Sequence, residues 1–155
     1  MLSETELMIA DGVQRNGWFV VNYAPTPGSD DPEEAFSYTV GLNQTASWPE
    51  LITFGLDSER AFSLFADLIG GCWEKKQPPV PHMTVSGLLK GMPVKLVEFA
   101  GTAPRYFHYA DWFARHTSSR KPRRLQLLWP DRDGKLPDDP ACDPEVRAKQ
   151  RMAGA

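Results

Sequence analysis

The sequence predicts an α+β domain, with a mostly antiparallel sheet of five to six strands and three to four helices packed on it. The expected strands come in pairs joined by short connections, rather than alternating one by one with helices. The chain has 155 residues, the length of one typical domain, and 41% of them are apolar, which is enough for a core. We therefore expect residues 1–155 to form a single compact domain.

The N-terminal residues 1–16 predict a helix with recognisable signals at both ends. Ser3 and Glu6 have the spacing of a capping box, in which each side chain bonds the backbone of the other residue. Gly17 stands where a left-handed residue ends a helix. The nearly continuous apolar run 18–23 then predicts a strand that is covered on both faces.

The next part of the chain predicts a pair of strands. Residues 25–34 are rich in Pro, Gly and Asp, and we expect them to form a flexible loop. Residues 36–42 alternate between large apolar and small side chains, which predicts a strand with one core face and one small polar face. Residues 43–49 are expected to turn the chain, so that a second strand over 51–56 lies beside the first.

A helix is expected after Asp57, which has the side chain of an N-cap. Six apolar residues repeat there at helical spacing: Ala61, Leu64, Phe65, Leu68, Ile69 and Cys72. They predict one apolar stripe laid on the sheet, with Gly70 and Gly71 weakening the end of the helix. Further along, residues 84–89 and 94–99 predict a hairpin.

The C-terminal third predicts two more helices and one strand. Residues 105–116 have a helical pattern, and 125–129 form a short apolar run that predicts a strand. Asp143 and Pro144 have the residue types of an N-cap and a first helical turn. We therefore expect a C-terminal helix and tail over residues 143–155.

Composition limits the classes of partner. The chain has 17 Lys and Arg against 20 Asp and Glu, a formal charge of −3, so its overall field makes nucleic acid and anionic membranes unfavourable partners. Two Cys give no disulfide framework. The chain opens with neither a basic nor an apolar signal region and contains no apolar run of about 18 residues. We expect a soluble, cytoplasmic protein that does not enter a membrane.

Four sequence blocks occur in a characteristic order. They are Gly-Trp-Phe-Val-Val at 17–21, Phe-Ser-Tyr-Thr-Val-Gly-Leu at 36–42, Trp-Pro-Glu-Leu-Ile-Thr-Phe-Gly-Leu at 48–56, and the block 125–137 that begins Leu-Gln-Leu-Leu-Trp-Pro-Asp. Together they resemble the bacterial family known as domain of unknown function 4262, and the resemblance covers nearly the whole chain. It implies a small bacterial protein and carries over no activity, cofactor or site residue. The basic stretch 118–124 departs from the pattern expected there.

The expected helix 105–116 carries the strongest concentration of polar side chains. If Tyr106, Ala110 and Phe113 face the core, roughly the other side presents Arg105, His108, Asp111, Trp112 and Arg115. Such donors beside an aromatic plane would suit a phosphate, or a nucleotide stacked on Trp112. The alternative is a solvated helix face with one half-buried Trp.

A second set of candidate ligand-binding residues lies where expected strands give way to loops. Its members are Tyr38, Thr39, Gln126, Trp129 and Asp131. Sites often form at such positions, so we expect these side chains to rim a pocket together with the Arg105, His108 and Trp112 face. The alternative for Gln126 is structural, with its amide satisfying backbone groups at a sheet edge.

Residues for conventional catalysis are sparse. His108 and Asp111 have the i, i+3 spacing that lets a carboxylate orient an imidazole, but no nucleophile stands beside them. Cys72 is expected to be a core thiol and Cys142 an unremarkable surface thiol.

No metal site is expected. His82, His108 and His116 are too scattered to form a ligand set. The block Asp131-Arg132-Asp133-Gly134 lacks the later ligands of a calcium loop, and a tight turn accounts for it.

The leading hypothesis is a ligand-binding or partner-binding, regulatory module with a local anion-binding face, whose ligand is a small anionic molecule or a protein partner. The rival is an enzyme, either a flavin-dependent redox protein or a hydrolase of a phosphorylated small substrate that uses His108 as its base. Glycine-rich phosphate loops are absent. The sequence leaves open the cofactor, the identity of the ligand, the assembly into homo-oligomers and the role of the basic residues Arg120 to Arg124.

Overall fold

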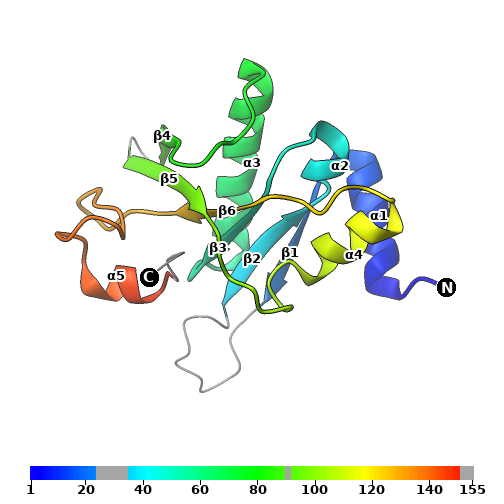
Figure 1. Ribbon diagram of the computed structural model, residues 1–155. Helices are drawn as coiled ribbons and strands as arrows, with labels where there is room; N and C mark the ends of the chain where they lie inside the picture. The colour runs from blue at the N-terminus through cyan, green and yellow to red at the C-terminus, as the bar shows by residue number, and fades with distance from the viewer. Residues whose placement is uncertain (24–34, 90–91, 151–155) are drawn as a thin grey trace.

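The computed structural model describes residues 1–23, 35–89 and 92–150, in which six strands form one sheet (Figure 1). The strands are β1 Phe19–Tyr23, β2 Phe36–Val40, β3 Glu50–Phe54, β4 Thr84–Leu89, β5 Met92–Glu98 and β6 Arg124–Leu128. Their order across the sheet is β1-β2-β3-β6-β5-β4. All neighbouring pairs are antiparallel except β3 and β6, which are parallel. The expected α+β class and mostly antiparallel sheet are confirmed.

The sheet is therefore two antiparallel meanders of three consecutive strands, β1-β2-β3 and β4-β5-β6, joined side by side. Their junction is the parallel pair, in which Glu50 lies opposite Arg124 and Ile52 opposite Gln126. A parallel pair needs a long crossover connection. Here that connection contains the longest helix and the two outer strands of the second meander.

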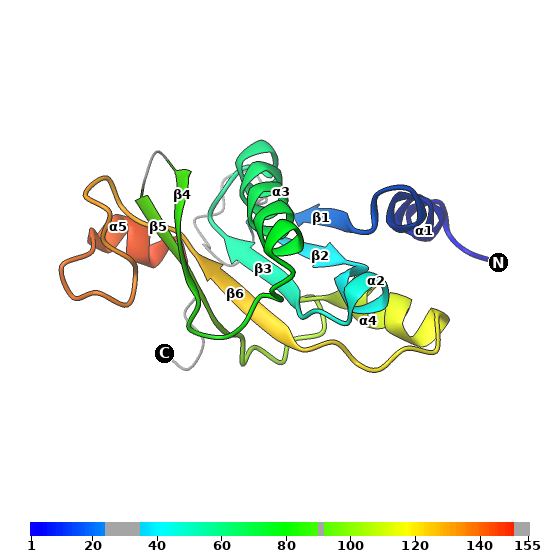
Figure 2. The same ribbon diagram turned by 90° about the horizontal axis from the view of Figure 1, so that it is seen from above.

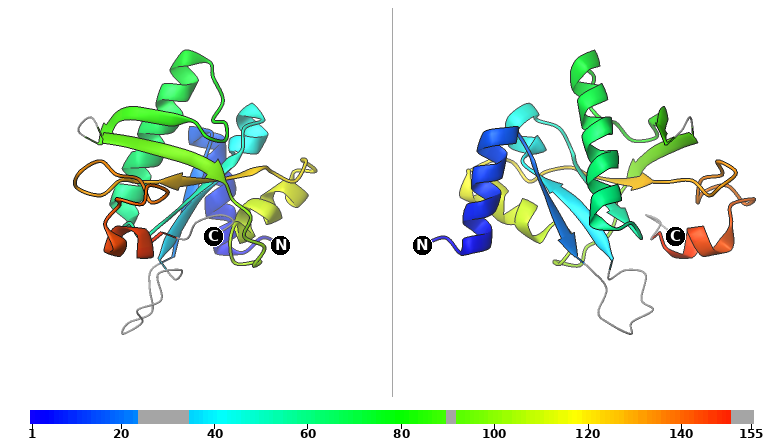
Figure 3. Two further views of the ribbon diagram at one scale, coloured as in Figure 1. Left: turned by 60° about the vertical axis from the view of Figure 1, so that its left-hand side comes forward. Right: turned by 180° about the vertical axis from the view of Figure 1, so that it is seen from behind.

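Helices cover both faces of the sheet (Figures 2 and 3). They are α1 Glu4–Asn16, α2 Leu42–Ala46, α3 Ser58–Lys75, α4 His108–His116 and α5 Pro144–Ala148. Residues of α1 and α4 share an apolar cluster with β1, β2 and β3, whereas α3 packs in a second cluster over β3, β6 and β5. The five helices of the described residues exceed the expected three to four because α2 forms where only a turn was expected.

The local signals at the first and third helices are confirmed. Ser3 Oγ accepts from the Glu6 backbone N–H at 3.1 Å, and the Glu6 carboxylate accepts from the Ser3 backbone N–H at 2.8 Å. Gly17 ends α1 at φ 87°. Asp57 caps α3 by accepting from Arg60 N at 2.8 Å. The six predicted stripe residues are all buried.

Gly70 and Gly71 do not end α3, which continues through them to Lys75 with Ile69 and Cys72 packed in the core. The expectation that β1 is covered on both faces is wrong. Within this strand only Val21 is buried, and Asn22 and Tyr23 at its end are exposed.

Strand β2 also differs from expectation. Its small residues Ser37 and Thr39 are buried along with its aromatic face, at 2% and 0% exposure. They are buried because α3 and its core cluster cover the side of the sheet that was expected to be polar.

The helix α4 begins at His108 rather than Arg105. Residues 104–107 form turns, and Phe107 precedes the helix in the left-handed region at φ 64°. This conformation allows the consecutive side chains of Tyr106 and Phe107 both to be buried. The helix α5 begins after Asp143 as predicted, with Pro144 in its first turn.

The predicted flexible loop 25–34 lies outside the described residues, and so does the part of the predicted C-terminal helix and tail beyond residue 150. Within the described ranges, no helix combines the length and the apolar character needed to cross a membrane.

Gly41 is a position where glycine is required, which gives a first prediction. Its φ is +103°, and a Cβ added there would lie 2.7 Å from both methyl groups of Val13. We expect Gly41→Ala to lower the free energy of unfolding by about 3 kcal/mol, from backbone strain plus overpacking. Gly87→Ala is the matched control, because Gly87 has φ +94° with open space around it and should lose only about 1 kcal/mol. Equal losses in chemical denaturation would contradict the Val13 contact.

Candidate functional site

Three of the expected site residues lie inside the protein rather than on a rim. Tyr38, Thr39 and Gln126 are all 0% exposed. Tyr38 belongs to the apolar cluster beneath α4, whereas Thr39, the next residue, points to the opposite face. Gln126 lies in β6, which is flanked by β3 and β5, so the alternative of satisfying a sheet edge does not apply to it.

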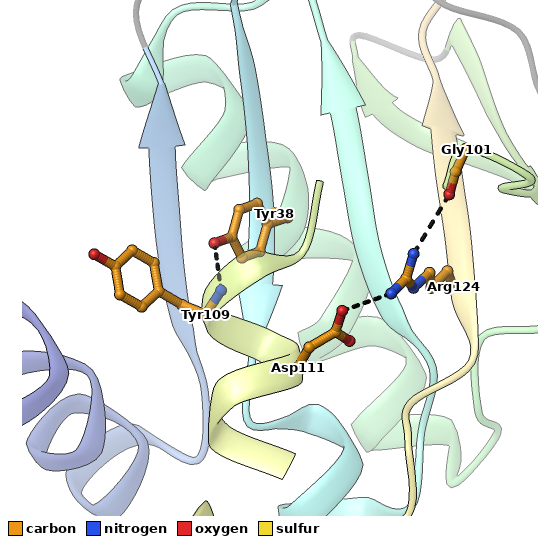
Figure 4. Close-up of polar contacts among 5 residues, drawn as sticks. All are labelled: Tyr38, Gly101, Tyr109, Asp111 and Arg124. Atoms are coloured by element: carbon orange, nitrogen blue, oxygen red, sulfur yellow. Dashed lines mark hydrogen bonds and ion pairs between the residues drawn. The ribbon is translucent and has the colours of Figure 1, made fainter. Parts of the chain in front are cut away.

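Tyr38 holds the first turn of α4 against the sheet. Its hydroxyl accepts a hydrogen bond of 2.9 Å from the backbone N–H of Tyr109 (Figure 4). It is also hydrogen-bonded to the hydroxyl of Tyr23, and burial raises the pKa of Tyr38 well above its ordinary value. Both features describe a neutral, structural tyrosine.

The expected polar face on α4 is divided along the helix. Arg105 lies before the helix, with its guanidinium bonded to the Tyr106 hydroxyl at 3.0 Å. His108 is exposed at the first residue of α4 and Arg115 is exposed in its last turn, about 10 Å further along the axis. Trp112 is half-buried, and its ring stacks on His116 at 5.1 Å between centroids.

Asp111 faces Arg124 rather than His108. Its carboxylate lies 2.7 Å from the Arg124 guanidinium, which also donates to the Gly101 carbonyl at 3.4 Å (Figure 4). The guanidinium sits 5.3 Å from the centre of the Phe107 ring. This pair fastens α4 to β6, so Asp111 does not have the geometry of a carboxylate that orients His108.

Trp129 and Asp131 lie together at the end of β6. The Trp129 indole donates to the Phe54 carbonyl at 2.8 Å. Asp131 accepts from three backbone N–H groups, of Asp133, Lys135 and Asp143, at 2.8 to 2.9 Å, and these donors hold the pKa of its carboxyl below the ordinary value. Asp131 therefore organises the loop that follows β6.

These two residues line an open groove of about 730 Å³ between that loop and α3. Asp57, Glu59 and Asp67 lie along it, and so do Arg60 and Arg132. The groove therefore carries more carboxylates than cations, and it does not match the expected anion site.

Cys142 differs from expectation, because it is buried, with only 3% of its surface exposed. The loop organised by Asp131 closes over it, and its Sγ lies 3.6 Å from the Asp143 carbonyl. Burial raises the pKa of this thiol, as it does for Cys72, which is a core thiol as predicted.

The basic stretch 118–124 meets α2 at a second pocket, of about 570 Å³. Its lining includes Asn43, Gln44, Trp48, Arg120, Lys121 and Arg123. We call this the basic pocket.

Two side chains of α2 fasten the basic stretch in place. The Asn43 amide donates to the Arg120 carbonyl at 2.7 Å, and the Gln44 amide donates to the Thr117 hydroxyl at 3.4 Å. The loop that carries the cations is therefore held by two hydrogen bonds, whose partners are 77 and 73 residues apart in the sequence.

The cations of the basic pocket are exposed. Within the described part of the chain, Arg120 and Lys121 form no ion pair, and Arg123 is 3.9 Å from a largely exposed Glu98, a separation at which attraction is weak. Lys121 also lines a smaller neighbouring pocket with Asp111 and Arg115, which are two residues of the predicted polar face. Sequence reasoning noted the basic stretch but did not place it beside residues 43–49.

Glu50 is the residue that sequence reasoning missed. It is 1% exposed, and its carboxylate accepts from the Thr39 hydroxyl at 2.8 Å. It also accepts from the backbone N–H groups of Gly41, Leu42 and Asn43 at 3.0, 3.2 and 3.1 Å. The signal available in the sequence was a single acidic residue at the start of the mostly apolar strand β3.

Burial raises the pKa of Glu50 to about 7, and the four donors offset part of that rise. Among the described residues no group of three or more His, Cys, Asp or Glu is arranged to hold a metal ion.

The raised pKa of Glu50 predicts a pH dependence of stability. The folded protein holds this proton more tightly than the unfolded chain, whose carboxyl has a pKa near 4.5, so the stabilisation is fully present below 4.5 and is lost as the pH rises toward 7. We expect this loss to reach about 3 kcal/mol at most. Urea titrations from pH 4 to 8 should show this fall in the free energy of unfolding in the parent and not in Glu50→Gln.

Glu98→Gln is the control, because it removes an exposed carboxyl from β5. Its free energy of unfolding should change with pH in the same way as that of the parent. A parent and a Glu50→Gln variant with parallel stability profiles would refute the assignment.

Comparison with known proteins identifies the family and little beyond it. Over 71 residues the chain is 32% identical to a protein of Vibrio parahaemolyticus serotype O3:K6 named "probable ketoamine kinase". The match takes in 46% of this chain and 24% of the other, so the chain spans about a quarter of that relative. No solved structure matches significantly. Residues 12–143 match the family described as domain of unknown function (DUF4262), and the chain belongs to that family.

Proposed function

We propose that the protein is a binding module for a small anionic molecule, with the basic pocket as its site. The observation that carries the proposal is the convergence of Arg120, Lys121 and Arg123 on one pocket of a chain whose net charge is −3. A local positive field of this kind attracts anions although the whole protein does not.

The chemistry of the lining favours a phosphate or carboxylate group. A guanidinium presents parallel donors that match two oxygens of either group, and a lysine adds a compact positive charge. Asn43 and Gln44 line the same pocket while bonding the loop, so they hold the backbone that carries the cations. A loop fixed before the ligand arrives loses less entropy on binding.

The similarity to a protein named as a kinase supports a phosphate-bearing ligand, because a kinase transfers a phosphoryl group from a phosphate-bearing donor. The same similarity favours a second candidate, an enzyme acting on a phosphorylated small molecule. In that case the exposed His108 stays the predicted base, without Asp111 as its partner. A flavin-dependent redox role stays a prediction.

Replacing two cations tests the proposed site. We expect Arg120→Gln with Arg123→Gln to weaken the binding of inorganic phosphate, measured by calorimetric titration, by about tenfold or more, because charge-assisted hydrogen bonds are lost. The free energy of unfolding should change by no more than about 1 kcal/mol, because both side chains are exposed. Parent affinity should also fall as salt rises.

The control is Arg60→Gln with Arg132→Gln, which removes the same charge from the groove beside Trp129. It should leave phosphate affinity within about twofold, since its charges lie at another pocket and are screened. An equal loss in both double variants would show a general charge effect, and no loss in either would rule out the basic pocket. Titration with acetate separates a preference for carboxylate from one for phosphate.

A further inference from the structure

The groove beside Trp129 has an apolar floor that the proposed function does not use. Its volume of about 730 Å³ is in the range of small-molecule sites. Leu56, Leu88 and Trp129 line it while packing from outside against the core cluster that contains α3, so each side chain is only partly covered. Met92, which is also half-buried, extends the floor from β5. Four separate segments of the chain therefore converge on one concave apolar surface.

Trp129 is a wall of the groove with a fixed orientation. Its indole N–H donates to the Phe54 carbonyl at 2.8 Å. Its backbone N–H donates to the side-chain oxygen of Gln150 at 3.0 Å, and its carbonyl accepts from the amide nitrogen of the same side chain at 2.9 Å. A ring held in this way loses little conformational freedom when a ligand covers it, and the face of an indole attracts cations.

Asp131 adds a buried charge to the lining of the groove. Its side chain belongs to a residue that is only 7% exposed. Oδ1 accepts from the backbone N–H groups of Asp133 and Lys135, whereas Oδ2 accepts from that of Asp143. A carboxylate can accept about four hydrogen bonds, so this one keeps the capacity for a further donor. The same backbone donors hold the pKa of Asp131 below its ordinary value, so the carboxylate is ionised at neutral pH.

The other charges of the groove favour a cation as well. Glu59 and Asp67 lie exposed on α3, across the groove from the loop after β6, and neither forms an ion pair in the parts of the chain that the structure describes. Asp57 and Arg60 lie 3.6 Å apart and offset each other. Apart from that pair, three carboxylates line the groove against one cation, Arg132. The field inside the groove therefore attracts positive charge.

We propose that this groove binds an amphipathic organic cation, which is an amine carried on an aromatic or alkyl body. The body lies on the apolar floor, and the ammonium group meets the face of Trp129 and the carboxylates on the two sides of the groove. Charge selects this ligand over a neutral or anionic one with the same body. The basic pocket shares no lining residue with the groove, so this inference does not depend on the proposed function.

A series of probes with one phenyl body tests the selection by charge. The probes are phenethylammonium, phenylethanol and phenylpropionate, each titrated into the full chain and followed by heteronuclear NMR. Each bound probe should shift the indole N–H signal of Trp129, which is identified by its loss in Trp129→Phe. We expect the cation to bind about tenfold more tightly than the alcohol, and the anion more weakly than either, because only the cation gains charge-assisted and cation–π contacts.

Removing the carboxylates from α3 should weaken only the charged probe. We expect Glu59→Gln with Asp67→Asn to lower the affinity for phenethylammonium about fivefold and to keep that for phenylethanol within about twofold. The matched control is Glu4→Gln with Glu74→Gln, which removes the same charge from exposed helix positions outside the groove. The control should keep both affinities within about twofold, because distant exposed charges are screened.

Removing the cations of the groove should have the opposite effect. Arg60→Gln with Arg132→Gln should strengthen the binding of phenethylammonium about threefold, because the two guanidinium groups oppose an added cation. A gain in affinity cannot arise from damage to folding. Equal affinities of the parent for the cation and the alcohol, a Trp129 signal that the cation does not shift, or no gain in this variant would overturn the proposal. None of these outcomes bears on the basic pocket, which the phosphate titrations test.

Discussion

The buried carboxylate of Glu50 is the contact on which much of the structure depends. It binds the end of β2 through Thr39 and the start of α2 through three backbone N–H groups. A buried charge is tolerated only while such donors are kept in place. The positive φ of Gly41 turns the backbone so that the N–H groups of residues 41–43 point at the carboxylate. Because α2 carries the side chains that fasten the basic stretch, the order of the basic pocket derives from Glu50.

The opposite face of the sheet uses a different device. There α4 is attached at two points, by the Tyr38 hydroxyl from the first meander and by Arg124 from the second. Apolar packing alone is non-directional and would allow several positions of α4. The two polar contacts fix one of them. Three of the residues predicted to bind a ligand, Tyr38, Thr39 and Gln126, are thus buried, whereas the cations of the basic pocket are exposed.

Local patterns were sufficient to predict much of the fold. The caps of α1 and α3 and the buried stripe of α3 depend on neighbouring residues alone. Features that depend on tertiary contacts were missed: the late start of α4 follows from burying Phe107, and the burial of Cys142 follows from the loop closed by Asp131. The candidate site was missed for the same reason, because Asn43 and Arg120 meet only in the folded protein.

The parallel pair of β3 and β6 has a consequence for how the chain folds. Every other strand pair joins strands that are consecutive in the chain, so it can form once the single connection between them has closed. The β3–β6 pair joins strands that are separated by α3, β4, β5 and α4, so it forms only after a much longer segment has folded back. Two separately formed halves then meet along one line of hydrogen bonds, with α3 packed across it. Folding should therefore be limited by the docking of the two halves along this line, which runs from the Glu50–Arg124 pair to the Ile52–Gln126 pair.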